Sequence, residues 1–179
     1  DVLDSIYFVF ERINTGGIRL SPQEIRNCIS LGPFIKHVKE LNEYPAWRSI
    51  FGAPNNRAKD EELIIRFFAL YERGNNYSRP MNGFLNRFSS SMNTVKPEQL
   101  NNLGDTFKRS IDKVNSAVGP RAFRIIRALN AAAFDSIMVG IAKRLEKLPE
   151  PSNTAVKEAY DALIADPEFL QVCERSTAD

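Results

Sequence analysis

Residues 97–118, PEQLNNLGDTFKRSIDKVNSAV, decide the fold class of this chain. Their apolar residues recur at steps of three and four, the spacing that places side chains on one face of a helix. Pro97 suits the first turn of that helix, and Gly119 and Pro120 end it. The apolar positions are Leu100, Leu103, Phe107, Ile111, Val114 and Val118.

The same spacing extends over most of the chain. It predicts helices over 21–30, 60–72, 121–147 with a break near Asn130, 153–165 and 167–174. The helix over 60–72 is apolar on most of its circumference, so we expect it to lie between other helices. Residues 6–10 have a strand-like composition, but they continue into a helical pattern, which favours a helix. We therefore expect an all-α fold, an irregular bundle of about eight or nine helices.

Composition excludes several classes of function. The chain has 179 residues, 43% of them hydrophobic and 26% charged, and no apolar run that could span a bilayer, so we expect no membrane partner. His37 is the only histidine, and Cys28 and Cys173 lie far apart. The sequence therefore has very few histidines and cysteines from which to build a zinc site or a Ser-His-Asp triad, and we expect no metal site. Both cysteines are expected to be semi-buried in a protein of the reducing cytoplasm.

Positive charge gathers in the middle of the sequence. Residues 61–130 hold 11 Lys and Arg against 6 Asp and Glu, whereas residues 131–179 hold 5 against 9. Arg121, Arg124 and Arg127 recur every three residues and would share one face of the predicted helix. Such a face could follow the backbone of DNA, although a solvated helix face is the plainer interpretation.

The most distinctive motif is FERINTGGIRLSPQE, residues 10–24. One helix is expected to end near Asn14, Gly16 and Gly17 permit a turn, and a capping box of Ser21 and Glu24 starts the next helix. A phosphate would prefer the start of that second helix, near Gly17 and Arg19, whereas a cation would prefer Asn14 or Glu11. On these residues alone, an ordinary glycine turn before a capped helix is the simpler interpretation.

Residues 10–17 and 20–27 resemble the Phe-x-x-x-Asn motif region of GmrSD-type proteins. These form a large bacterial group of domains of unknown function, whose catalytic core is similar to ParB and sulfiredoxin. Phe10 and Asn14 match the motif, and Gly16 and Gly17 adjoin it. Weaker likenesses follow in order at 60–70 (DEELIIRFFAL), 84–86 (FLN), 132–138 (AAFDSIM) and 166–177.

The resemblance implies a part of an NTP-dependent nuclease that restricts DNA and defends bacteria against phage. It makes residues 1–30 the edge of a ParB-like nucleotide-handling core and residues 31–179 a helical bundle. It also implies nucleotide contacts by Asn14, Gly16, Gly17 and Arg19, with Phe10 and Glu11 in support. The family's upstream Asp-Gly-Gln-Gln-Arg motif and its His-rich nuclease motif are absent from this sequence. We therefore expect NTP with Mg²⁺ in a longer protein, no cofactor on this chain alone, and no activity by it alone.

Two further expectations concern packing and partners. Glu62 and Arg66 stand four residues apart, acid first, which predicts a structural ion pair. Residues 6–10 would be apolar on every side of a helix, so this helix either threads through the bundle or covers a partner that precedes Asp1. We favour the second interpretation, with the ParB-like core as partner and self-association through this helix.

A non-enzymatic interaction module and a helical DNA-binding module remain alternatives to the nuclease interpretation. The polar loops 55–57 and 75–77 suggest no chemistry.

Overall fold

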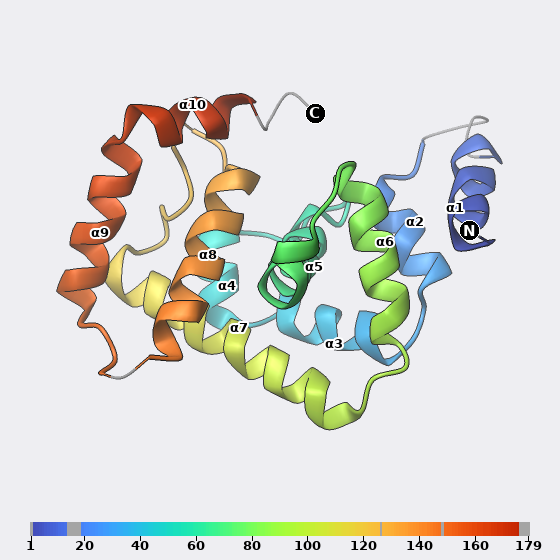
Figure 1. Ribbon diagram of the computed structural model, residues 1–179, viewed down its shortest axis with the longest axis horizontal. Helices are drawn as coiled ribbons and strands as arrows, with labels where there is room; N and C mark the ends of the chain where they lie inside the picture. Colours follow the sequence, from blue (N-terminus) through green and yellow to red (C-terminus); the bar gives the residue numbers. More distant parts are fainter. Residues whose placement is uncertain (1, 14–18, 126, 148, 176–179) are drawn as a thin grey trace. The chain divides into compact units, whose positions relative to one another are not determined.

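The computed structural model describes residues 2–13, 19–125, 127–147 and 149–175. These residues form ten α-helices and one short 3₁₀ helix, with no strand among them, so the predicted all-α fold is confirmed (Figure 1). In the described part of the chain no helix is long and apolar enough to cross a membrane. The helices are α1 Val2–Ile13, α2 Pro22–Ile29, α3 Pro33–Asn42, α4 Pro45–Phe51, α5 Lys59–Arg73, η1 Gly74–Asn76, α6 Met81–Met92, α7 Pro97–Ala117, α8 Ala131–Leu145, α9 Asn153–Ala165 and α10 Pro167–Arg175.

The chain divides into two compact units. Unit 1 comprises Asp1–Glu43 and Pro54–Gly104, and unit 2 comprises Tyr44–Ala53 and Asp105–Asp179. The chain therefore enters unit 2 twice, first with α4 and then from the middle of α7 onward. The boundary near residue 30 that the family resemblance implies falls inside unit 1.

Unit 1 is built around α5, which packs against α2, α3 and α6. This confirms the expectation from its apolar circumference, since six of its apolar side chains are buried. Phe68 meets Phe34 of α3 at 6.2 Å between ring centroids, and Phe34 meets Phe88 of α6 at 5.7 Å. Such ring pairs add to the free energy of burying their area.

The core of unit 2 surrounds Trp47 of α4, whose side chain is completely buried. Its ring lies 6.1 Å from that of Phe107 in α7 and 5.4 Å from that of Phe134 in α8. Phe134 in turn packs edge-on against Phe123 at 5.0 Å. Three segments far apart in the sequence therefore meet at this tryptophan and its neighbours.

The predicted helix over 121–147 is wrong in its first part, because α8 begins only at Ala131. Phe123 has φ 65°, in the left-handed region, and its fully buried ring packs into the core of unit 2. Its backbone N–H donates to the Tyr160 hydroxyl at 3.1 Å, and its carbonyl accepts from the N–H of Asn130 at 2.9 Å. Asn130 then caps α8 through Ala133 N at 2.9 Å. The packing of Phe123 in the core therefore determines the conformation of this segment, in place of the helix that the residue spacing predicted.

Helix α1 packs on α2 within unit 1, and its strand-like residues are helical as predicted. Tyr7 is buried, and its hydroxyl lies 2.9 Å from that of Ser30. The other large apolar side chains described on α1 are exposed: Ile6, Phe8, Val9 and Phe10. The interpretation that this helix threads through the bundle is therefore wrong.

Candidate functional site

The glycine loop of the motif lies largely outside the described residues. This applies to Asn14, Gly16 and Gly17 and to the side chain of Glu11, so their predicted nucleotide contacts stay predictions. The two flanks of the loop are described. Phe10 is exposed on α1, and Arg19 is exposed just before α2.

The start of α2 carries the predicted capping box, which is confirmed. The Ser21 hydroxyl accepts from Glu24 N at 3.1 Å, and the Glu24 carboxylate accepts from Ser21 N at 2.6 Å. This bond to the Ser21 backbone, helped by the Ser21 side chain and the charge of Arg57, lowers the pKa of Glu24. A carboxylate thus already occupies the positive end of α2, so a phosphate at this helix end would meet a negative neighbour.

Arg57 connects the start of α2 to the loop before α5. Its Nε lies 3.3 Å from a carboxylate oxygen of Glu24, and a second guanidinium nitrogen donates to the carbonyl of Arg19. Its own carbonyl accepts from the Ser21 hydroxyl at 2.9 Å. The sequence suggested no chemistry for loop 55–57. The signal that could have indicated a contact with the start of α2 was Arg57, the one positively charged residue of this loop. Arg19, Ser21, Glu24 and Arg57 therefore form a single polar corner.

Arg26 lies one turn further along α2 and is completely buried. Its Nε donates to Asn86 Oδ1 of α6 at 3.0 Å, and its Nη1 donates to Gln23 Oε1. The same Nη1 forms a 3.8 Å ion pair with Glu62 of α5. Its Nη2 has no hydrogen-bond partner among the described residues. Burial lowers the pKa of Arg26, an effect that the charge of Glu62 opposes.

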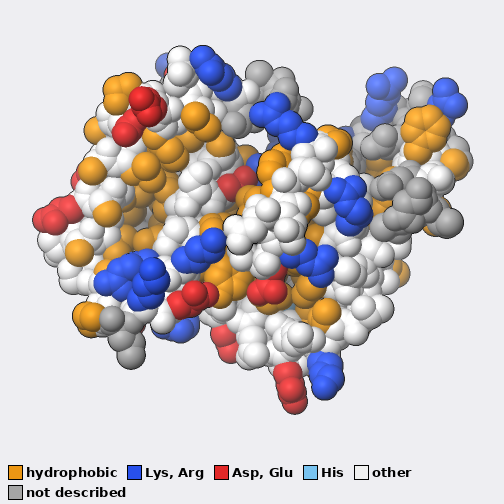
Figure 2. Space-filling model, in the orientation of Figure 1, with side chains coloured by type: hydrophobic (Ala, Val, Ile, Leu, Met, Phe, Trp, Pro, Cys, Tyr) orange, Lys and Arg blue, Asp and Glu red, His pale blue; other side chains and the backbone are white. Residues whose placement is uncertain are grey.

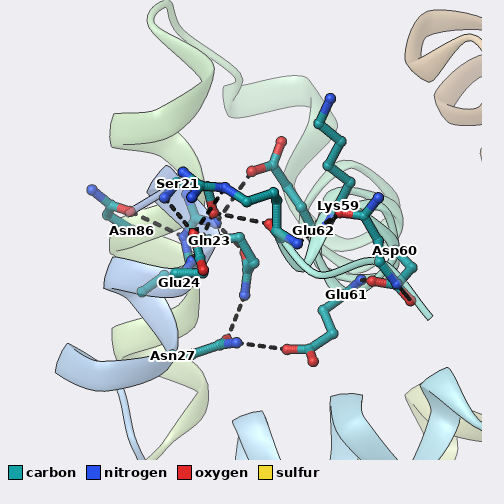
Figure 3. Close-up of polar contacts among 12 residues, drawn as sticks. Ser21, Gln23, Glu24, Asn27, Lys59, Asp60, Glu61, Glu62 and Asn86 are labelled. Carbon is teal, nitrogen blue, oxygen red and sulfur yellow. Dashed lines mark hydrogen bonds and ion pairs between the residues drawn. The ribbon is translucent and has the colours of Figure 1, made fainter. Parts of the chain in front are cut away.

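The polar contacts continue from Gln23 across to α5 (Figure 3). Gln23 Nε2 donates to Asn27 Oδ1 at 2.7 Å, and Asn27 Nδ2 donates to Glu61 Oε2 at 2.7 Å. Burial raises the pKa of Glu61, although the bond from Asn27 works in the opposite direction. These contacts join α2, α5 and α6 through side chains inside unit 1.

The predicted pair of Glu62 and Arg66 stays a prediction. Glu62 forms an ion pair with Arg26, and half-buried Arg66 lies close enough for its charge to help lower the pKa of Arg26. Sequence reasoning missed Arg26 as the centre of this cluster. The available signal was a polar series within a short, capped helix, namely Gln23, Arg26 and Asn27.

The predicted basic helix face over 121–127 is wrong in its geometry, because the described residues 121–125 and 127 form turns, bends and irregular backbone rather than a helix. Arg121 and Arg127 are exposed. Arg124 is half-buried, and its guanidinium donates to the carbonyls of Pro120 at 3.0 Å and Phe51 at 3.5 Å. The three arginines therefore do not share a helix face, and DNA contact by them stays a prediction.

No group of three His, Cys, Asp or Glu side chains that could hold a metal ion occurs in the part of the chain that the structure describes. Cys173 is buried, and burial raises the pKa of its thiol. Cys28, expected to be semi-buried, is exposed.

No family model, curated protein or solved structure matches this chain. The likeness to GmrSD-type proteins accordingly depends on the motifs quoted above.

Proposed function

We propose that this chain is the helical portion of a GmrSD-like, ParB-related protein that belongs to an NTP-dependent anti-phage or restriction nuclease. In this proposal it completes the nucleotide pocket and forms the interface with the ParB-like core. One observation carries the proposal. Helix α1, which carries Phe10 of the Phe-x-x-x-Asn motif, exposes four large apolar side chains.

Exposed apolar side chains that gather on one short element are typical of an interaction surface. Phe8 is 56% exposed, and Ile6, Val9 and Phe10 are exposed to 41–49%. Figure 2 shows hydrophobic side chains on α1 on the face in view. A helix of this kind is stabilised when a second apolar surface covers it. We assign that covering to the ParB-like core.

The nucleotide contacts are assigned to the loop after α1. Asn14 matches the family motif, and Arg19 offers an exposed guanidinium at the other end of the loop. Because Glu24 occupies the start of α2, the phosphate contact is assigned to Arg19 and the loop backbone rather than to the first turn of α2. Mg²⁺ would accompany the NTP.

A nucleotide titration of the whole natural protein tests the pocket. Fluorescent ATP and GTP analogues are titrated with Mg²⁺ against the unchanged protein, Asn14→Ala and Arg19→Ala. Each variant is expected to weaken binding about tenfold, which matches a lost charge-assisted or amide hydrogen bond of about 1.4 kcal/mol. Arg121→Ala, an exposed arginine of unit 2, is the matched control. Unchanged affinity in Asn14→Ala would remove the pocket assignment.

A non-enzymatic interaction module is the second candidate, and the exposed side of α1 favours it as well. In that case the glycine loop is only a turn, and α1 also mediates self-association. Light scattering of the chain is expected to show a mass that rises with concentration above 20.3 kDa. Phe8→Ser combined with Phe10→Ser is expected to return the mass to that of one chain. A single-chain mass for the unchanged protein at all concentrations would contradict self-association.

A further inference from the structure

The segment from 73 to 97 contains no acidic residue. Its 25 positions include Arg73, Arg79, Arg87 and Lys96, together with ten Asn, Ser and Thr residues. The segment therefore has four positive charges and no negative charge, whereas the whole chain has a net charge of only +2. It runs from the end of α5 through η1 and α6 to the start of α7, all within unit 1.

Two of its side chains lie over neighbouring turns of α6. The guanidinium carbon of Arg73 lies 5.3 Å from the centroid of the Phe88 ring. The Tyr77 ring packs edge-on against Phe84 at 5.2 Å, and Tyr77 is 38% exposed. Phe84 and Phe88 are four residues apart, so they lie on the same face of the helix. Arg73 and Tyr77 are therefore placed on that face.

The guanidinium of Arg87 lies near the N-terminal end of α6. Its Nη1 lies 3.3 Å from where a Cβ on Gly83 would be, and Pro80 Cγ lies 3.9 Å from that point. The guanidinium thus folds back one turn toward the loop that holds Arg79 and Pro80. Arg73, Arg79 and Arg87 are all exposed. Figure 2 shows Lys and Arg side chains over α6 on the face in view.

We propose that the surface formed by Arg73, Tyr77, Arg79 and Arg87 binds single-stranded nucleic acid. Three guanidinium groups with no carboxylate in their segment suit a phosphate backbone. A half-exposed tyrosine ring beside them suits stacking of an unpaired base, which is the combination that single-strand-binding surfaces use. A duplex keeps its bases stacked and offers none to Tyr77. This proposal is independent of the nucleotide pocket assigned to the loop after α1.

The number of contacts sets the expected salt dependence. For single strands the logarithm of affinity falls with the logarithm of salt concentration with a slope of about −0.7 for each phosphate neutralised. Three arginine contacts therefore predict a slope of about −2. Removing two of them is expected to reduce its magnitude by about 1.4.

Fluorescence anisotropy with labelled 15-nucleotide dT, 15-nucleotide U and a 15-base-pair duplex tests the surface between 50 and 200 mM NaCl. The chain is expected to bind single strands at least tenfold more tightly than the duplex. Arg79→Glu with Arg87→Glu is expected to weaken binding at least tenfold and to flatten the salt slope. Tyr77→Leu keeps an apolar contact for Phe84 and is expected to weaken binding about fivefold with the slope unchanged. Comparison of dT with U identifies which strand is preferred.

Arg109→Glu with Arg175→Glu is the matched control, since it reverses two exposed arginines of unit 2 that belong to no proposed binding surface. It is expected to change single-strand affinity less than twofold. Circular dichroism melting curves establish that each variant is folded. Three results would overturn the proposal: no binding of either single strand at 50 mM NaCl, equal losses in the two arginine pairs, or tighter binding of the duplex.

Discussion

Arg26 is a fully buried cation whose partners come from three helices of unit 1. Truncation would remove the donor that Arg26 supplies to the oxygens of Asn86 and Gln23, and it would remove the positive charge that pairs with Glu62. Breaking a buried pair in this way costs about 3–5 kcal/mol. We therefore expect Arg26→Met to lower the free energy of unfolding by about 3 kcal/mol in urea denaturation.

The control for Arg26 is Arg121→Met, which changes an exposed arginine and is expected to alter stability by less than about 0.5 kcal/mol. Equal stability of the Arg26→Met protein and the unchanged protein would mean that the polar cluster contributes nothing net to folding. Because Nη2 of Arg26 has no hydrogen-bond partner in the described part of the chain, the cluster is not fully satisfied there, and this makes the test informative.

The raised pKa of Glu61 predicts that the stability of the folded state falls as pH rises. A carboxylate in an ion pair gives the opposite dependence. Burial raises the pKa of Glu61 from the ordinary value of 4.5, so the folded state favours the protonated form. Its ionisation therefore lowers stability above the raised pKa, and this penalty disappears below pH 4.5, where both states are protonated. Glu61→Gln keeps an oxygen for Asn27 and is expected to raise the urea midpoint at pH 7.

At pH 4 the advantage of Glu61→Gln is expected to shrink toward zero, because the carboxyl group is then largely neutral in the unchanged protein as well. The measurement is urea denaturation of both proteins at the two pH values. A lower midpoint for the variant at pH 7 would show that the charge of Glu61 is favourable and would reverse this interpretation.

At the scale of elements, α7 and α8 offer a matched pair of glycines. A Cβ on Gly104 would lie 2.5 Å from Nε2 of His37 in α3, so the imidazole must move. Outside its own stretch of helix, no atom of the described residues lies within 4 Å of the Cβ position on Gly140. Gly104→Ala is therefore expected to lower stability by about 1–3 kcal/mol, and Gly140→Ala to raise it by about 1 kcal/mol. Thermal melting of the two variants tests this contrast, and a gain from both would contradict the close packing at Gly104.

The elements that the sequence predicted well are those with local signals. The capping box before α2 needs only Ser21 and Glu24, and Pro97 with a regular apolar series is sufficient for α7. The segment 121–130 failed because its conformation depends on Tyr160, which lies 37 residues from Phe123. Local spacing carries no information about such a contact.

The polar cluster shows the same limit. Its members on α2 are neighbours in the sequence, but their partners Glu62 and Asn86 come from α5 and α6. A single sequence without a known fold does not indicate that these residues meet. The exposed side of α1 was predictable, because five consecutive apolar residues in a helix need covering on every side.

At the scale of the whole molecule, the two units are interleaved along the chain. Residues 44–53 belong to unit 2, although unit 1 residues precede and follow them. Composition and linker patterns reveal boundaries between consecutive domains, so they gave no indication of this arrangement. The division at residue 30 that the resemblance implies follows a sequence motif, and residue 30 lies inside unit 1.

Because the two units are interleaved along the chain, Trp47 is synthesised well before the helices that cover it. Trp47 leaves the ribosome long before Phe107 and Phe134, the rings that bury it. At about 5–20 residues per second, translation reaches Phe134 roughly 4–17 s after Trp47. Throughout that interval the largest apolar side chain of the nascent polypeptide lacks its later covering from α8. Helix α4 therefore offers chaperones a binding segment for as long as synthesis of α8 is incomplete.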